Sequence, residues 1–268
     1  MRSAFRRHAE IYALMFRNSL IREMNFKANF LLWMVVELLW FAAQIIFVEV
    51  IFSYVDRIGD WTKWEMVLLI GTHQIIGQLF QAFFFVNIAE LPELVRTGKL
   101  DFLLLQPMDS QFATSMKKFG LDSVVNAGLG VVFVVFAAGK LNLHPSALQI
   151  SLYAAAILLG VTIHYSMMFA LASVSFWVVR SQGLIYGYFS FFNIGRYPDA
   201  IFKGVFKWVF SWIIPVIIVS NVPARILAKA AQSNLLLLGQ LLGVAILLFV
   251  MTRFFWKFAL TRYSSASS

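Results

Sequence analysis

Several polar side chains of this sequence lie inside long apolar runs, where they are costly to keep and could serve a chemical purpose. Within residues 65–89, Gln74, Gln78 and Gln81 recur at helical spacing, and Phe85 continues the same face. For a single glutamine, a hydrogen bond between packed membrane helices is the simpler interpretation. For the whole stripe we favour the wall of a translocation path or a contact between subunits.

Two ionisable side chains also lie inside apolar runs. Glu37 is deep in the run over residues 29–52, where a charge costs at least about 2.5 kcal/mol. Its carboxyl group is therefore either protonated or faces protein or water. His164 lies inside another run. A lone histidine there is more often hydrogen-bonded to a neighbouring helix than used as a ligand or proton relay.

The sequence carries no catalytic motif that we can identify. It contains no GxxxxGK[ST] loop, no HExxH and no GxSxG. Its four histidines are scattered at positions 8, 73, 144 and 164, and it has no cysteine, so no metal cluster is predicted. We expect no enzymatic activity and no cofactor in this chain. The net charge of +9 flanks the apolar runs, which indicates membrane topology rather than nucleic-acid binding.

The composition indicates a membrane protein. The chain is 60% hydrophobic, with a mean hydropathy of +0.78, and only 13% of its residues are charged, against about 25% in soluble domains. Its 268 residues form one membrane domain. Membrane spans are predicted at residues 29–52, 65–89, 112–138, 147–179 and 235–258. The segment before the last span permits two assignments. One is a span over 205–222; the other is a short span over 182–197, followed by a helix over 202–222 that enters the membrane and returns.

The two ends of the chain differ from the spans. Residues 3–26 alternate apolar and basic faces at helical spacing, which is typical of a helix lying in the membrane interface. The Ser-rich residues 261–268 are predicted to be disordered. Basic residues concentrate in the N-terminal arm, after the second span and at the C-terminal end. The positive-inside rule therefore places both termini in the cytoplasm.

The connection after the second span contains a candidate docking helix. Pro92 suits the first turn of a helix and Gly98 the position just past its end, so residues 91–97 are predicted to form two helical turns at the membrane surface. An ordinary solvated loop is the alternative. In the last span, Gly239 and Gly243 form a GxxxG sequence, which permits close helix contact but is also common by chance in apolar sequence.

Two local sequences resemble those of a known family. Residues 91–107, LPELVRTGKLDFLLLQP, resemble its short helix, glycine, Leu-Asp pair and Leu-rich run to a proline. Residues 193–198, NIGRYP, with prolines at 215 and 223, resemble its re-entrant region. With the order of the spans, these features make the chain similar to the membrane subunit of a bacterial ATP-binding-cassette exporter of the type-2 permease class.

The resemblance implies an all-α, polytopic membrane fold in a single permease domain. It would have an interfacial helix over 1–27, six spans within 28–260 and a re-entrant segment over about 199–223, which selects the short fifth span. A cytoplasmic coupling helix would contact the ATPase subunit through Leu91, Pro92, Glu93, Leu94, Val95, Arg96, Thr97 and Gly98. ATP and magnesium would be bound by that separate subunit, at the bacterial inner membrane.

The mechanism implied by the resemblance is alternating access. Two permease subunits, identical or homologous, would form a path flanked by the glutamine stripe and by Tyr188, Phe192 and Asn193 of the fifth span. Two other functions stay open. An ion-driven transporter or channel would use Glu37 and His164, but no internal repeat with paired broken helices is evident. A non-transporting membrane anchor or assembly protein would leave the polar stripe as packing.

Overall fold

The computed structural model describes residues 27–178, 181–229 and 234–263. Apart from one bridge between Ile58 and Trp61, the regular secondary structure of these residues is helical, which confirms the all-α prediction. The interfacial helix predicted over residues 1–27 lies outside them, except for Lys27, which is the first residue of a helix that continues to Phe52. So do residues 264–268 of the predicted tail, whose first residue, Thr261, is instead the last of a helix.

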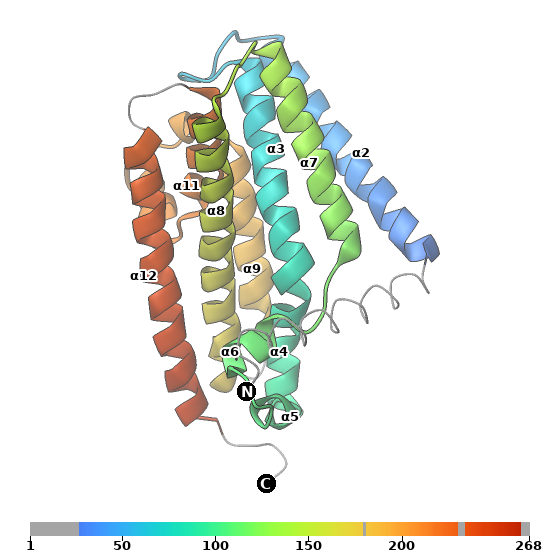
Figure 1. The fold of residues 1–268 in the computed structure, drawn as a ribbon, viewed down its shortest axis with the longest axis vertical. Coiled ribbons are helices and arrows are strands. Elements are labelled where there is room, and N and C mark those ends of the chain that lie inside the picture. Colours follow the sequence, from blue (N-terminus) through green and yellow to red (C-terminus); the bar gives the residue numbers. More distant parts are fainter. Residues whose placement is uncertain (1–26, 179–180, 230–233, 264–268) are drawn as a thin grey trace.

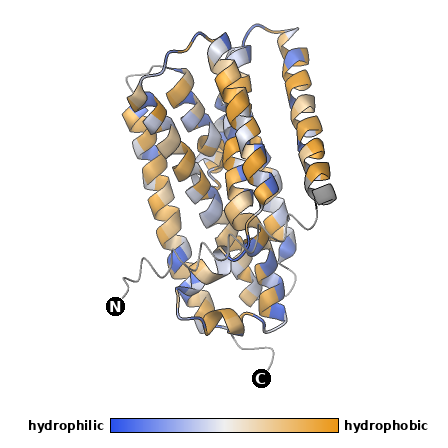
Figure 2. Cartoon of the chain, turned by 45° about the vertical axis from the view of Figure 1, so that its right-hand side comes forward, coloured by the Kyte–Doolittle hydropathy of each residue, from blue (hydrophilic) through white to orange (hydrophobic). Residues whose placement is uncertain are grey.

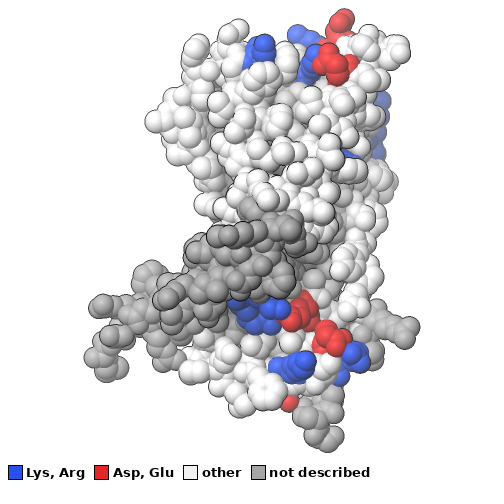
Figure 3. Space-filling view, turned by 90° about the vertical axis from the view of Figure 1, so that its right-hand side faces the viewer, with Lys and Arg blue, Asp and Glu red and all other residues white. Residues whose placement is uncertain are grey.

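Five helical runs of the described chain are long and apolar enough to cross a membrane. They are α2 (Lys27–Phe52), α3 (Lys63–Phe80) continued by η1 (Gln81–Phe85) and α4 (Val86–Arg96), α7 (Leu121–Lys140), α8 (Ala147–Ser173) continued by η2 (Val174–Phe176), and α12 (Asn234–Thr261). They stand side by side along the long axis (Figure 1) and carry mostly hydrophobic residues (Figure 2). Charged side chains gather toward the two ends, with a largely uncharged band between (Figure 3). The chain is a multi-pass membrane protein.

Local signals fix where several of these helices begin. Thr62 and Glu65 form a capping box at the start of α3, in which the Thr62 backbone N–H donates to the Glu65 Oε2 at 2.7 Å. The Ser146 Oγ accepts from the Gln149 N–H at 3.2 Å at the start of α8. Both caps lie at the same end of the bundle. This end, opposite the one that carries α5 (Asp101–Leu104) and α6 (Ser110–Ser115), is called the far end below; the other is the α5 end (Figure 1).

The chain between α8 and α12 must return from the α5 end to the far end, because both helices run toward the α5 end (Figure 1). The return is made by α9 (Gln182–Phe192) and η3 (Asn193–Arg196), which have 11 and 4 residues. Fifteen residues rise about 22 Å, less than the ~30 Å of a bilayer core. This segment corresponds to the short fifth span predicted at 182–197.

The next segment is bent, as its prolines indicated. It comprises η4 (Asp199–Ile201), α10 (Gly204–Trp208), η5 (Val209–Ile213) and α11 (Val216–Ala228). Gly204–Ile213 and Val216–Ala228 meet at an angle of 84° around Pro215. By length and composition this pair is either a broken span or a re-entrant loop. In Figure 1, α11 lies in the far half of the bundle, beside α8.

Two predicted boundaries are wrong. Residues 91–97 are not a separate helix, because the second span continues through Pro92 to Arg96. The third span begins at Leu121 rather than near 112, after an unwound stretch between Ser115 and Leu121. The cause is a set of long-range hydrogen bonds. Asn87 holds both backbone groups of Lys118, each at 2.9 Å, and the Gly120 N–H donates to the Ala82 carbonyl at 2.9 Å.

The helices α3 and α7 pack closely through two glycines. A Cβ added to Gly71 would stand 3.2 Å from the Gly130 carbonyl oxygen, and one added to Gly130 would stand 3.1 Å from that of Gly71. The small side chains Ser123 and Ala127 lie buried on the same helix as Gly130. Gly239 and Gly243, in contrast, are exposed and have nothing within 4 Å of an added Cβ, so the GxxxG sequence makes no close contact within the chain.

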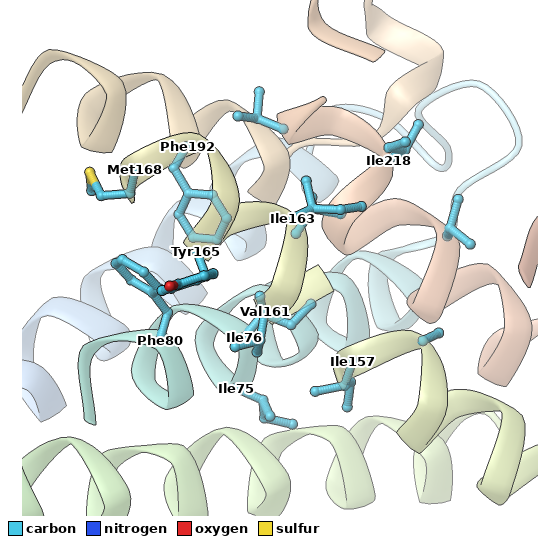
Figure 4. Packing of buried hydrophobic residues seen from close by; sticks show 14 of the residues in the cluster. Ile75, Ile76, Phe80, Ile157, Val161, Ile163, Tyr165, Met168, Phe192 and Ile218 are labelled. Atoms are coloured by element: carbon cyan, nitrogen blue, oxygen red, sulfur yellow. The ribbon is translucent and has the colours of Figure 1, made fainter. Parts of the chain in front are cut away.

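The core lies where α3, α8, α9 and α11 meet. Its buried side chains include Phe80 and Ile76 from α3, Met168 and Ile163 from α8, and Phe192 from α9 (Figure 4). Because α8 is buried along much of its length, it is the central helix around which the others are arranged.

Candidate functional site

A small polar cavity lies between α2, α3 with η1, and α9 with η3. Its volume is about 90 Å³. Five of the predicted path residues line it, namely Gln74, Gln78, Gln81, Phe192 and Asn193, and so does the ionisable Glu37. The structure therefore brings together residues up to 156 positions apart in the sequence. Polar side chains converging at membrane depth are costly unless they face protein or water, so they mark a candidate functional site.

Glu37 faces this cavity rather than lipid. The Gln74 Nε2 donates to the Glu37 Oε2 at 3.3 Å, and the Glu37 side chain is half-buried. This contact agrees with the alternative in which Glu37 faces protein or water. Sequence reasoning missed three further polar side chains that line the same cavity: Gln44, His73 and Arg196. Gln44 lies seven residues from Glu37, at helical spacing, and this signal could have identified it.

An aromatic stack forms the wall behind the cavity. The His73 ring stacks on Phe192 with centroids 4.4 Å apart, and Phe192 packs on His164 at 3.8 Å. The Nδ1 of His73 is 3.0 Å from the Ser220 Oγ of α11. The Nδ1 of His164 is 3.3 Å from the Tyr188 hydroxyl of α9, a contact between neighbouring helices of the kind expected for a lone histidine. His164 and Tyr188 lie in the core and do not line the cavity.

Phe85 also stays outside the cavity, and the local helix geometry explains why. Residues Gln81–Phe85 form a π-helical turn within the α3–α4 run. A π turn has more residues than an α turn, so the face that carries Gln74 and Gln78 no longer continues to Phe85. Instead Phe85 packs on Phe189, with ring centroids 5.3 Å apart. The fixed period of 3.6 residues holds as far as Gln81 and fails after it.

The predicted docking helix is largely buried in its own chain. Leu91 is fully buried, Leu94 is 7% exposed, and Pro92 and Gly98 are also buried. Gly98 has the predicted positive φ, at +70°. The exposed members of the segment are Arg96 and Thr97; Glu93 and Val95 are half-buried. Arg96 pairs with Glu93 at 2.7 Å.

The exposed apolar surface at this end lies one turn further along the chain. Phe102 and Leu105 are 72% and 81% exposed, on and just after the short helix α5, which forms the tip of the molecule in Figure 1. We call these two residues the α5 tip. Large apolar side chains this exposed at the end of a membrane protein favour a protein contact. The α5 tip follows the segment that sequence reasoning selected.

Ion pairs connect the chain on both sides of the α5 tip to the rest of the bundle. Glu90 of α4 accepts from Lys117 at 3.2 Å and from Lys118 at 3.0 Å. Asp109, just before α6, pairs with Arg253 of α12. The Trp256 Nε1 of α12 donates to the Ser110 Oγ at 3.0 Å. The segment between α4 and α7 is therefore anchored to both the second and the last span.

The far end is closed by a different charged cluster. Arg225 of α11 donates to the Asp60 Oδ2 at 2.6 Å and to the Asp199 Oδ1 at 2.6 Å. Lys229 reaches the same Asp60 at 2.5 Å, and the buried Trp61 lies under the Arg225 guanidinium, 4.9 Å from ring centroid to Cζ. The hydrogen bond from Arg225 holds the pKa of Asp60 well below its ordinary value.

Comparison with known protein families identifies the class of this fold. A family model described as ABC-2 family transporter protein matches residues 38–267, which is nearly the whole described chain. No curated protein and no solved structure matches the sequence significantly.

Proposed function

Because the chain belongs to the ABC-2 family of transporter proteins, a permease family whose ATPase is a separate subunit, we propose that it is the transmembrane subunit of an ATP-driven exporter that works by alternating access. The sequence has no phosphate-binding loop of its own, which agrees with hydrolysis by a partner. The proposal adds three elements: the export direction, a second permease subunit and the contact with the ATPase.

The observation that carries the proposal is the polar cavity. Glu37, Gln74, Gln78 and Arg196 meet at membrane depth, yet the helix on one side, α2, is buried over only 11% of its apolar window. Its exposed side chains include Leu39 at 67% and Trp40 at 57%, and Trp40 also lines the cavity. A second permease subunit, identical or homologous, would cover α2 and complete the path.

We assign six crossings to each subunit. They are α2, the α3–α4 run, α7, α8, α9 with η3, and α12; α10 and α11 form the re-entrant segment. With both termini in the cytoplasm of a bacterial inner membrane, the α5 end is cytoplasmic and the far end faces outward. One face of the short α9 packs on α8 and η1, while Leu184, Tyr186 and Phe191 are 45%, 58% and 46% exposed.

The contact with the ATPase is proposed to centre on the α5 tip. The coupling surface then comprises the exposed Arg96 and Thr97, followed by Phe102 and Leu105. The buried Leu91, Pro92 and Leu94 support it from within. Because α4 continues α3 without a break, movement of the tip would displace Gln74 and Gln78 directly along one helical run.

An ion-driven mechanism through Glu37 and His164 is less well supported. Only Glu37 lines the polar cavity, whereas His164 lies in the aromatic core. No group of three or more His, Asp or Glu in the described residues could hold a metal ion. A non-transporting anchor would leave the converging glutamines as packing between helices.

The test is purification of the tagged chain from its native membrane in mild detergent, with identification of co-purifying proteins and an ATPase assay. We expect an ATPase subunit in stoichiometric amount. Leu105→Asp should release it, whereas Tyr54→Asp, at an 85% exposed position of the far end, should not. A homo-oligomer without ATPase, transporting substrate, would refute the proposal.

A further inference from the structure

A second cavity, of about 620 Å³, lies between α3, η1, α6, α8 and α12. It shares no lining residue with the polar cavity. Its volume lies in the range of sites that hold small organic ligands. Apolar side chains from all five elements make up most of its wall, among them Leu79, Phe84, Val161 and Phe249. We call it the lateral cavity.

The lateral cavity opens onto the outer surface of the bundle. Two of its lining residues, Leu158 of α8 and Phe249 of α12, are 64% and 44% exposed. Both belong to helices long and apolar enough to span the membrane, and both lie well inside those helices. The surroundings of the opening are therefore hydrocarbon rather than water, so a molecule entering there must be apolar along its length.

One end of the lateral cavity is polar and charged. Asp109 and Arg253 line it together with Gln111, Ser115 and Tyr165. Arg253 donates through one terminal nitrogen to the Asp109 Oδ1 at 2.9 Å and to the Gln111 Oε1 at 3.1 Å. The ion pair stays accessible, since the Arg253 and Asp109 side chains are 33% and 40% exposed.

The bonds to Asp109 and Gln111 use three of the five N–H groups of a guanidinium. Among the described residues, this leaves two for an oxyanion. Arginine binds phosphate through such paired donors. The neighbouring Asp109 carboxylate would repel a purely anionic group but would attract an ammonium group. The charged end thus presents Arg253 to an anionic group and Asp109 to a cationic group.

We propose that the lateral cavity binds a zwitterionic phospholipid. One acyl chain lies among Leu158, Val161 and Phe249, the headgroup phosphate bonds Arg253, and the headgroup ammonium faces Asp109. The cavity is apolar where the bilayer is hydrocarbon and charged where helix α12 reaches its basic end at Arg253 and Lys257. In Figure 1, α12 and α2 lie on opposite sides of the bundle, so a second subunit covering α2 would leave this opening free.

The experiment uses the purified full-length chain in nanodiscs that contain phosphatidylethanolamine with a photo-reactive diazirine at the end of one acyl chain. After illumination, cross-linked residues are located by mass spectrometry. We expect labels on lining residues such as Val161, Thr162 and Phe249, and competition by excess unlabelled phosphatidylethanolamine. Thr162→Trp should obstruct the cavity and lower labelling about fivefold. Leu247→Trp, at a 58% exposed position of α12 outside the cavity, should not.

Leu158→Trp should block the opening from a lipid-exposed position. It replaces Thr162→Trp in the experiment if that variant does not fold. Equal labelling in the Thr162→Trp or Leu158→Trp variant and in Leu247→Trp would overturn the binding site, because the label would then report the lipid layer around any membrane protein. Competition by phosphatidylglycerol as strong as that by phosphatidylethanolamine would overturn the zwitterionic headgroup. Stronger competition by phosphatidylethanolamine supports the pairing with both Arg253 and Asp109.

Discussion

The two ends of the bundle use charged side chains for different purposes. At the far end, Arg225 bridges Asp60 and Asp199, so the first loop, the segment after α9 and the helix α11 are joined over the buried Trp61. Cations and carboxylates satisfy one another there, and the residues that they connect are remote in sequence. This end is closed by its own contacts.

At the α5 end the ion pairs lie beside α5 and do not cover its outermost side chains. Glu90 with Lys118, and Asp109 with Arg253, fix the chain on either side of α5. The outermost side chains are apolar and unshielded, as Phe102 and Leu105 show. A rigidly braced, apolar tip has the properties of a surface that transmits force from a partner. We therefore expect matched substitutions at the two ends to change the stability of the protein by different amounts.

The largest effect is expected from introducing a carboxylate into the buried part of the α5 end. Leu94→Asp places a charge at a 7% exposed position and should cost about 4 kcal/mol or more. Leu105→Asp, at 81% exposure, should cost less than about 0.5 kcal/mol. Fluorescence-detected size-exclusion chromatography of the solubilised protein measures both. Loss of folded protein in the Leu105 variant would contradict the exposed tip.

The next largest effect is expected from opening the far end. Arg225→Ala leaves Asp60 and Asp199 without their shared partner and should destabilise the protein by about 2–3 kcal/mol, as for hydrogen bonds to charged groups. Arg96→Ala removes a pair that is about half exposed on both sides and should leave the Tm in detergent unchanged. Similar shifts of Tm in the two variants would erase the distinction between the ends.

A smaller effect is expected from Asn87→Ala. This substitution removes two hydrogen bonds to the backbone of Lys118, and their loss should cost about 1–3 kcal/mol. Hydrogen exchange should then accelerate between Met116 and Gly120. Thr97→Ala, which removes an exposed bond to the Glu93 carbonyl, is the control. Unchanged protection from hydrogen exchange after Asn87→Ala would show that the bonds from Asn87 to the Lys118 backbone do not cause the unwinding before the third span.

The smallest effect is expected from acidification at the far end. The pKa of Asp60 is lowered by Arg225, so its contribution to stability is complete above the ordinary value of 3.8 and declines as the pH falls through the lowered pKa. The difference in Tm between wild type and Asp60→Asn should therefore be constant from pH 7 to about 5 and should shrink below pH 4. A difference in Tm that grows on acidification would contradict a lowered pKa of Asp60.

Local patterns predicted what depends on one helix at a time. The apolar runs gave the spans, and the spacing of Gln74, Gln78 and Gln81 gave the face that lines the polar cavity. The positive φ of Gly98 also followed from local chemistry. These features need only the helical period and the cost of polar groups in hydrocarbon.

Features that depend on contacts between distant residues were not predictable in this way. The unwinding after Ser115 results from bonds that Asn87 and Ala82 make 31 and 38 residues along the chain. Glycines that permit close packing, such as Gly71 and Gly130, lie on different helices, whereas the recognisable GxxxG motif at Gly239 points outward. A sequence motif shows that close approach is possible but not which helix approaches.

The π turn at Gln81–Phe85 also sets how the second span tolerates a change of length. Elsewhere in an α-helix, deleting one residue turns all that follows by about 100° and shortens the helix by about 1.5 Å. Within Gln81–Phe85, the chain already carries one residue more than an α turn needs. A single deletion there can be absorbed by converting the π turn to an α turn, with the glutamines above and the α5 tip below keeping their orientation. Related chains that differ in length within this span should place the gap at this turn.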